Sequence, residues 1–162
     1  MHLAHLRLRD FRNYARLDVD FGPGFHLLLG DNAQGKTNIL EAVYLMATLR
    51  SFRGVGGAQM VRHGQKGYFV GGKVIGQGER EIKMYWSTSE RSLSLDGRPV
   101  RKLTGYLGAL RTVVFCTEDL QLVKGTARKA ISSAATWWGR AITKSKCIGR
   151  CASGSSPSTV SR

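Results

Sequence analysis

Eight consecutive residues could bind the phosphates of a nucleotide: Gly30-Asp31-Asn32-Ala33-Gln34-Gly35-Lys36-Thr37. Their spacing is G-x-x-x-x-G-K-T, which is typical of a loop that wraps around a triphosphate. The two glycines allow backbone angles that a Cβ would forbid, so the N–H groups between them can turn inward and form a concave anion site. The Lys36 ammonium would lie between the β- and γ-phosphates of ATP, and the Thr37 hydroxyl would bind Mg²⁺. We therefore predict that all eight residues contact ATP, with Thr37 as the metal ligand.

The segments on either side of the loop have the sequences that such a site needs. Residues 25–29 are a short apolar run after the turn-forming Gly22-Pro23-Gly24, which predicts a buried strand. Positions 36–52 carry apolar residues at roughly helical spacing without Gly or Pro, which predicts a helix. The N-terminus of that helix, with its partial positive charge, would face the phosphates. A glycine-rich turn that binds no ligand is the alternative, and both flanks argue against it.

Strand signals dominate much of the remaining sequence. Alternating residues predict strands over 2–8 and 17–21, joined by the turn Phe11-Arg12-Asn13-Tyr14. Residues 68–100 predict an antiparallel β meander, in which Asp96-Gly97 forms a tight turn. The expected fold is therefore α/β, with the loop and its helix beside an antiparallel meander.

Three further segments complete the expected order of elements. Residues 50–66 are basic and rich in glycine, so we expect irregular structure there. A short helix over 101–110 and a buried, β-branched strand over 112–116 would follow the meander.

The end of the chain has a different composition. Residues 126–162 contain 12 Ser or Thr and 7 Lys or Arg but no acidic residue, and neither a helical nor a strand period is sustained. Such a composition is typical of disorder. We therefore divide the chain into an ATP-binding lobe over residues 1–125 and a disordered basic tail over residues 126–162.

The charge of the chain indicates an anionic partner. Net charge is +14, from 25 basic and 11 acidic residues among 162. Nucleic acid is the commonest polyanion that such an excess attracts. The distribution weakens this inference, because residues 120–162 hold eight basic residues and no acid, and so carry +8 by themselves. No apolar run approaches the roughly 18 residues of a membrane span, and no secretion signal is visible, so we expect a cytoplasmic protein with no membrane partner.

The cysteines do not indicate a disulfide framework. There are three, Cys116, Cys147 and Cys151, and an odd number favours reduced thiols. The spacing Cys147-x-x-x-Cys151 resembles half of a metal site, but no second Cys/His pair lies near it in the sequence.

Several separate motifs resemble one family in their order and spacing. They are Phe11-Arg12-Asn13-Tyr14, the loop continued as Asn38-Ile39-Leu40-Glu41-Ala42, Ser51-Phe52-Arg53, Asp96-Gly97-Arg98-Pro99-Val100, and residues 115–125. Over about residues 1–125, the chain resembles the N-terminal part of the RecF family of bacterial DNA replication and repair proteins. That family belongs to the ABC-type ATPases and is related to the SMC proteins. The resemblance implies the N-terminal lobe of an ABC-ATPase-like P-loop NTPase.

The resemblance also implies an ATP-dependent role in DNA replication, repair and the response to DNA damage. Members of the family bind ATP, pair head to head as homodimers and hold single-stranded or gapped DNA. Together with recombination mediator proteins, they help to load recombinase at single-strand gaps. The nucleotide contacts of the family correspond here to Gly30, Asn32, Gly35, Lys36 and Thr37.

Six positions stand out by resemblance without a settled role. Ala33 stands where family members often have Gly, and Ala would cost about 1 kcal/mol if the position needs a positive φ. Arg53 could reach a phosphate or a partner subunit, or be a solvated charge, and the same alternatives hold for Arg12. Glu118 or Asp119 lies roughly where ABC ATPases place the loop that senses Mg²⁺ and the γ-phosphate. The family usually has Pro at position 117.

The groups that an ABC ATPase uses to hydrolyse ATP are not recognisable, so the catalytic residues are unknown. Such an enzyme needs a signature segment that clasps the γ-phosphate from the opposite subunit and a Walker B strand that ends in acids. No carboxylate side chain follows Asp119 in this chain.

The sheet should have an apolar face that a C-terminal lobe would cover. Because that lobe is not recognisable in the sequence, we predict that the folded chain has low stability.

A frameshift would explain the unusual tail. If residues 129–132 were encoded by AAG-GCG-ATT-TCT, a shift of one base would spell Arg-Arg-Phe-Leu, which resembles the continuation of the RecF family. We hypothesise that a frameshift precedes residue 130 and that the tail is out-of-frame translation. The nucleotide sequence tests this directly.

Two other functions fit parts of the sequence. A small P-loop kinase or GTPase would keep a Walker B acid after a buried parallel strand, and residues 112–116 followed by Glu118-Asp119 imitate that pattern. A non-enzymatic basic DNA-binding module would bind DNA with a steep dependence on salt and without regard to ATP.

Overall fold

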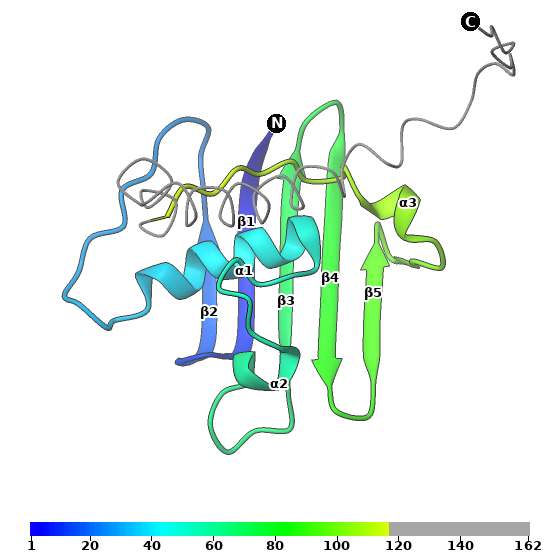
Figure 1. Ribbon diagram of the computed structural model, residues 1–162. Helices are drawn as coiled ribbons and strands as arrows, with labels where there is room; N and C mark the ends of the chain where they lie inside the picture. Colours follow the sequence, from blue (N-terminus) through cyan, green and yellow to red (C-terminus); the bar gives the residue numbers. More distant parts are fainter. Residues whose placement is uncertain (117–162) are drawn as a thin grey trace, which may run out of the picture. The chain divides into compact units, whose positions relative to one another are not determined.

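One antiparallel sheet carries the other elements of the structure (Figure 1). The computed structural model describes residues 1–116, and its six strands follow the order β2-β1-β3-β4-β5-β6. The strands are β1 (His2–Phe11), β2 (Tyr14–Asp20), β3 (Gly67–Ile75), β4 (Glu79–Ser87), β5 (Arg91–Leu95) and β6 (Arg98–Pro99). The helices are α1 (Lys36–Thr48), α2 (Gly57–Met60) and α3 (Leu103–Tyr106).

The first two strands form the hairpin that the alternating sequence predicts. Phe11 pairs with Tyr14, so Arg12 and Asn13 form the tip of the turn. Across the pair, Arg7 Nε donates a hydrogen bond of 2.7 Å to Asp18, and this contact holds the pKa of Asp18 down to about 2. The hairpin thus places two polar side chains, those of Arg12 and Asn13, at one end of β1.

The predicted meander is also confirmed, and it joins the hairpin in a way that the sequence did not predict. Strands β3 to β6 pair in succession, and Asp96 and Gly97 turn the chain between β5 and β6 with φ values of 53° and 75°. Strand β3 then pairs with β1, with Leu8 opposite Val70. Hairpin and meander therefore form a single sheet rather than two separate units.

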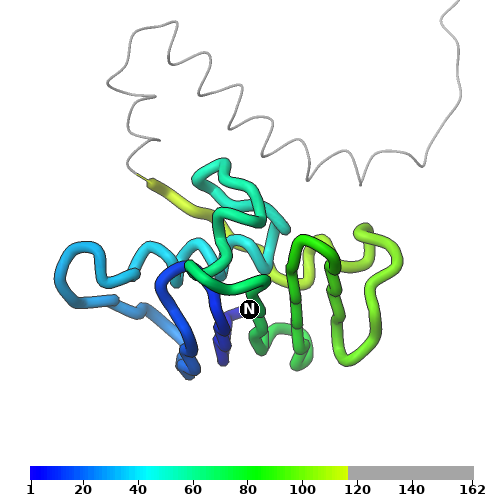
Figure 2. The backbone as a smooth tube through the Cα atoms, turned by 90° about the horizontal axis from the view of Figure 1, so that it is seen from below, coloured from blue at the N-terminus to red at the C-terminus, as the bar shows by residue number. Residues whose placement is uncertain are grey.

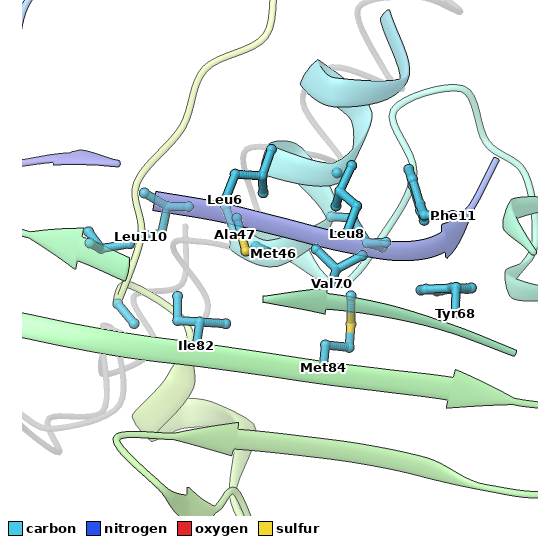
Figure 3. Packing of buried hydrophobic residues seen from close by; sticks show 14 of the residues in the cluster. Leu6, Leu8, Phe11, Met46, Ala47, Tyr68, Val70, Ile82, Met84 and Leu110 are labelled. Atoms are coloured by element: carbon cyan, nitrogen blue, oxygen red, sulfur yellow. The ribbon is translucent and has the colours of Figure 1, made fainter. Parts of the chain in front are cut away.

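The core lies between one face of this sheet and α1. Alternate residues of a strand point to the same face, so alternate side chains of β1, β3 and β4 contribute to it. In β1 the alternation breaks at Asp10, which has a φ of 50°, and Phe11 follows Leu6 and Leu8 into the core. The buried residues that Figure 3 labels are Leu6, Leu8, Phe11, Met46, Ala47, Tyr68, Val70, Ile82, Met84 and Leu110. Figure 2 shows α1 and α2 on the same side of the sheet. This packing fixes how α1 lies, and with it the loop that leads into α1.

Close packing of α1 on β3 depends on Gly72. A Cβ at this position would lie 2.8 Å from the backbone oxygen of His5 and 3.1 Å from the Met46 side chain. Both distances are shorter than ordinary van der Waals contacts, so any larger residue would push β3 away from β1 or from the helix. The absence of a side chain at Gly72 therefore sets the distance between helix and sheet.

The helices are shorter than predicted. Helix α1 begins at Lys36, as expected, but ends at Thr48 rather than near position 52. The segment 50–66 is mostly irregular, as expected, but includes the short helix α2. The helix predicted over 101–110 is reduced to the four residues of α3, where the buried Tyr106 hydroxyl donates to the Met46 carbonyl and burial raises the pKa of Tyr106.

Two predicted buried strands are wrong. Residues 25–29 are irregular, and Leu27 and Leu29 are each 81% exposed. Residues 112–116 also form no strand, and Val113 is 93% exposed. A buried strand needs hydrogen-bonded neighbours along its edges and side chains packed on both faces. The sheet within residues 1–116 includes neither segment, so their apolar sequences alone do not make them strands.

Some predictions concern residues beyond this range. The basic tail, Glu118, Asp119, Cys147 and Cys151 lie outside the described residues. Cys116 lies within them and is not part of a disulfide bond. Among residues 1–116, no helix has the length and apolar character needed to cross a membrane.

We predict that Gly72→Ala lowers the free energy of unfolding by about 1–3 kcal/mol, because the added methyl group overpacks the junction of β1, β3 and α1. Urea denaturation measures this. Gly78→Ala is the matched control, since nothing lies within 4 Å of a Cβ built there. Equal stability of the two variants would contradict the packing argument.

Candidate nucleotide-binding site

The predicted phosphate loop adopts a backbone that turns repeatedly into the left-handed region. The φ angle is 145° at Gly30, 66° at Ala33 and 101° at Gly35. Such alternation turns successive N–H groups toward the inside of a loop, which creates an anion site. Gly35 is also the N-cap of α1, so the loop runs directly into the first turn of the helix. The predicted sequence of loop and helix is therefore present, although the predicted strand before the loop is not.

Positive charge lies across the loop. The Lys36 ammonium donates hydrogen bonds to the backbone oxygens of Gly30 at 2.5 Å and Asp31 at 2.7 Å. The N–H groups of Lys36 and Thr37, the first two residues of α1, precede the first helical hydrogen bonds, which Asn38 and Ile39 donate to the Gly35 carbonyl, and this end carries the partial positive charge of the helix. Thr37 is exposed in this same turn. An ammonium, free backbone donors and a hydroxyl are thus brought together, which is the donor set that a metal-bound triphosphate requires.

Ala33 is the strained member of the loop. Its φ of 66° is a left-handed conformation, in which a Cβ costs about 1 kcal/mol or more relative to glycine. The question left open by the sequence, whether this position needs a positive φ, is therefore answered. The alanine side chain itself is exposed, so backbone strain and not crowding is the penalty.

A buried carboxylate lies in the second turn of α1. Glu41 is 0% exposed, and Arg12 Nε and Nη2 donate to its two oxygens at 2.9 and 2.7 Å. Ser51 Oγ donates to one of the same oxygens at 2.5 Å, and Arg53 Nη1 lies 3.6 Å from the other. Glu41 thus joins the β1–β2 turn, α1 and the segment that follows α1.

These contacts separate the roles of the two arginines. The Arg12 side chain is 18% exposed and also donates to the Gln59 carbonyl at 3.0 Å, so its guanidinium is directed into the protein. In this structure the Arg12 guanidinium is therefore bound to Glu41 and the Gln59 carbonyl rather than solvated. Arg53 is 37% exposed, and its Nη1 donates at 3.2 Å to Asn38 Oδ1 in the first turn of α1. Arg53 therefore lies beside the start of the helix.

Sequence reasoning gave no role to three polar residues that support the loop: Asn13, Asn38 and Glu41. Asn13 Nδ2 donates to the Gln34 carbonyl at 3.0 Å. All three residues lie within the motifs that carry the family resemblance, and that was the only signal. The spacing of Glu41 within α1 does not reveal its burial, which depends on segments distant in the sequence.

The metal ligand predicted at Thr37 has no cluster of acidic residues around it. Within residues 1–116, no group of three or more His, Cys, Asp or Glu could hold a metal ion.

A cavity of about 620 Å³ lies away from the loop. Helices α1 and α2 and strands β4 and β5 line it, mostly with apolar atoms, and Arg50 and Arg91 contribute to its wall. No residue of the loop takes part, so this cavity is not the phosphate site.

We predict that Ala33→Gly raises the free energy of unfolding by about 1 kcal/mol, because glycine adopts the left-handed conformation without strain. Ala58→Gly, within α2, should have the opposite sign and cost about 0.5–1 kcal/mol. Urea denaturation compares them, and destabilisation by both substitutions would disprove strain at Ala33.

We also predict that Glu41→Ala lowers the free energy of unfolding by about 3 kcal/mol or more, because it leaves the guanidinium of Arg12 largely buried without its carboxylate. Glu79→Ala removes a carboxylate from the exposed ion pair with Lys73 and should cost less than about 1 kcal/mol. Thermal and urea unfolding provide the measurement. A small effect of Glu41→Ala would mean that the three joined segments hold together without it.

Comparisons with known proteins agree with this geometry. A family model described as an AAA domain matches residues 5–144. The chain is 44% identical over 128 residues to the DNA replication and repair protein RecF of Kineococcus radiotolerans, and 39% identical over 126 residues to that of Lactobacillus johnsonii. Both alignments cover 77% of this chain but only 32% and 34% of the relatives. The chain therefore spans about a third of the length of the curated relatives that it matches.

Solved structures give the same result for the fold. A structure described as the recombination mediator protein RecF-ATP in the RecFOR pathway matches with a TM-score of 0.71 and 28% identity, over 83% of this chain and 38% of that one. An SMC ATPase structure matches with a TM-score of 0.67 over 80% of this chain and 95% of that one, and at 19% identity it supports the fold alone. The expected α/β fold, that of a P-loop NTPase N-terminal lobe, is confirmed. Since the family model matches most of the chain, the protein belongs to the AAA domain family, and it is similar to the N-terminal third of RecF proteins.

Proposed function

We propose that this chain binds ATP together with Mg²⁺ at residues 30–37 and acts in DNA replication and repair. The observation that carries the proposal is the loop itself, which combines left-handed residues, the Lys36 ammonium and the start of α1 in one place. A structure that resembles this chain is described as RecF with ATP, which supports the same ligand here.

Each part of the loop has a separate task in this proposal. Backbone N–H groups of the loop and of the first helical turn would donate to phosphate oxygens. Lys36 would exchange its contacts with the Gly30 and Asp31 carbonyls for phosphate oxygens. Thr37 would add one ligand to Mg²⁺, which when bound neutralises charge on the β- and γ-phosphates.

We propose ATP binding for residues 1–116, and we give Glu41 no role in hydrolysis. A general base must be free to accept a proton from water. Glu41, the carboxylate on α1, is engaged by Arg12 and Ser51 and cannot serve that purpose. We therefore assign no catalytic residue.

We further propose that DNA, single-stranded or gapped, is the macromolecular partner. Residues 1–119 carry 17 basic and 11 acidic residues, a net charge of +6 before the tail is counted. The RecF relatives are named for DNA replication and repair, and the RecF structure at 28% identity is described as that of a recombination mediator protein. By the likeness to RecF we propose an ATP-dependent homodimer that works with recombination mediator proteins in the cytoplasm.

We retain the division at residue 125 as part of the proposal, with the frameshift as its explanation. Sequencing the gene tests the frameshift: a shifted frame that does not continue into a RecF-like arm would rule it out.

A small kinase or GTPase is less favoured, because every strand pair among the described residues is antiparallel, whereas those enzymes place their acid after a parallel strand.

We predict that Lys36→Ala weakens binding of ATP·Mg²⁺ by about 10- to 100-fold, because charge-assisted hydrogen bonds contribute about 1.5–3 kcal/mol. Isothermal titration calorimetry on the purified chain measures this. Lys66→Ala removes the same charge from an exposed position outside the loop and should leave the affinity unchanged. If the wild-type chain is folded and releases no heat with ATP·Mg²⁺, the proposed function is wrong.

We predict that ATP strengthens binding of the chain to a single-stranded oligonucleotide and that Lys36→Ala removes this strengthening. Fluorescence anisotropy at several salt concentrations provides the measurement. If the affinity for the oligonucleotide falls steeply with salt but does not depend on ATP, the result would instead support the non-enzymatic basic DNA-binding module.

A further inference from the structure

Three polar side chains form a continuous chain of hydrogen bonds that ends on the phosphate loop. Asn13 Nδ2 donates to the Gln34 carbonyl at 3.0 Å, and Asn38 Nδ2 donates to Asn13 Oδ1 at 2.8 Å. Arg53 Nη1 then donates to Asn38 Oδ1 at 3.2 Å. We call Asn13, Asn38 and Arg53 the amide relay. It connects the β1–β2 turn, the first turn of α1 and the segment after α1 to the loop.

The two ends of the amide relay fix the orientation of both asparagines. The Gln34 carbonyl can only accept a hydrogen bond, and the Arg53 guanidinium can only donate. Each asparagine must therefore turn its NH₂ group toward the loop and its oxygen toward Arg53. Because a flipped amide would break a contact on both sides, the relay has one direction.

The first member of the relay is held firmly in place. The backbone N–H of Arg12, the residue before Asn13, donates to the Met60 carbonyl at 2.8 Å, and its guanidinium is fixed by Glu41. Asn13 also lies against the loop itself. A Cβ at Gly35 would come within 2.5 Å of Asn13 Nδ2, so glycine is needed there for close approach as well as for its φ of 101°.

Anchoring the Gln34 carbonyl determines where the next N–H group points. In a trans peptide, the carbonyl of one residue and the N–H of the following residue point in opposite directions within one plane. The Gln34 carbonyl faces Asn13, so the Gly35 N–H faces away from Asn13. In a loop that binds phosphate through its N–H groups, this orientation decides whether Gly35 can donate to the ligand.

We propose that Asn13 and Asn38 are positioning residues that hold the Gln34–Gly35 peptide in the orientation that binds phosphate. The inference rests on the proposed function for its nucleotide, and on the amide relay for its geometry. Asn13 acts directly on the peptide, Asn38 keeps the Asn13 amide in its orientation, and Arg53 completes the chain. Arg53 thereby influences the phosphate loop without contacting it.

The test measures ATP·Mg²⁺ affinity, the Gly35 amide signal and the urea midpoint of the full chain. Asn13→Ala should weaken ATP binding about ten-fold, since one hydrogen bond is lost. Asn13→Asp should weaken it at least as much, because a carboxylate fills the same space but cannot donate to the Gln34 carbonyl. Asn38→Asp should weaken it less, about three-fold, because it keeps an acceptor for Arg53 but loses the donor to Asn13. The urea midpoints should stay near that of the wild type.

A matched control and a nucleotide-free signal separate this inference from the proposed function. Gln77→Ala removes an exposed amide in the turn between β3 and β4, at the end of the sheet opposite Asn13, and should change nothing. In ¹⁵N-edited NMR without ATP, the Gly35 amide signal should move in all three asparagine variants. This signal tests the relay even if the wild-type chain binds no ATP.

Two outcomes would overturn the proposal. A Gly35 signal that does not move in Asn13→Ala and Asn38→Asp would show that the relay does not orient the peptide. Affinity of Asn13→Asp equal to that of the wild type would show that the donated hydrogen bond is irrelevant to phosphate binding.

Discussion

The position of the phosphate loop depends on one buried carboxylate. Removing a charged group from water costs several kcal/mol, so Glu41 is stable in the interior only while Arg12 and Ser51 supply hydrogen bonds. These two partners come from the β1–β2 turn and from the segment after α1. The carboxylate is therefore satisfied only when three parts of the chain meet, and their meeting fixes the rotation of α1. Because α1 begins where the loop ends, the same contacts locate the loop.

The loop itself combines strain with support. Three residues adopt left-handed angles, and one of them, Ala33, lacks the freedom of glycine. On one side the loop is continuous with α1, while on the other it leads to the exposed, irregular residues 25–29. Asn13 and the amide relay hold the loop from a third direction, through a side chain rather than the backbone. A loop that binds anions through its backbone N–H groups needs such support, because each peptide must keep the orientation in which its N–H can donate to the anion.

Short-range sequence patterns predicted much of the fold. They failed where residues distant in the sequence determine whether a segment forms a strand. The hairpin, the meander, the turn at Asp96-Gly97 and the start of α1 were all predicted correctly, since turn residues and periodic apolar residues act over a few positions. Residues 25–29 and 112–116 have equally good strand sequences and are not strands. An apolar run becomes a strand only when another strand pairs with it, and its own sequence does not carry that information.

By itself, the sequence determined the chemistry of the site. The order of Gly30, Gly35, Lys36 and Thr37 specifies the donors for a triphosphate, because backbone freedom and the adjacent helix follow from residues that are neighbours in the chain. Only the tertiary structure decided that β3 pairs with β1, that Arg12 is bound to a buried carboxylate, and that Asn13 reaches the Gln34 carbonyl. These contacts join residues that are 21 or more positions apart, and they form because burial and hydrogen-bond satisfaction are properties of the assembled chain.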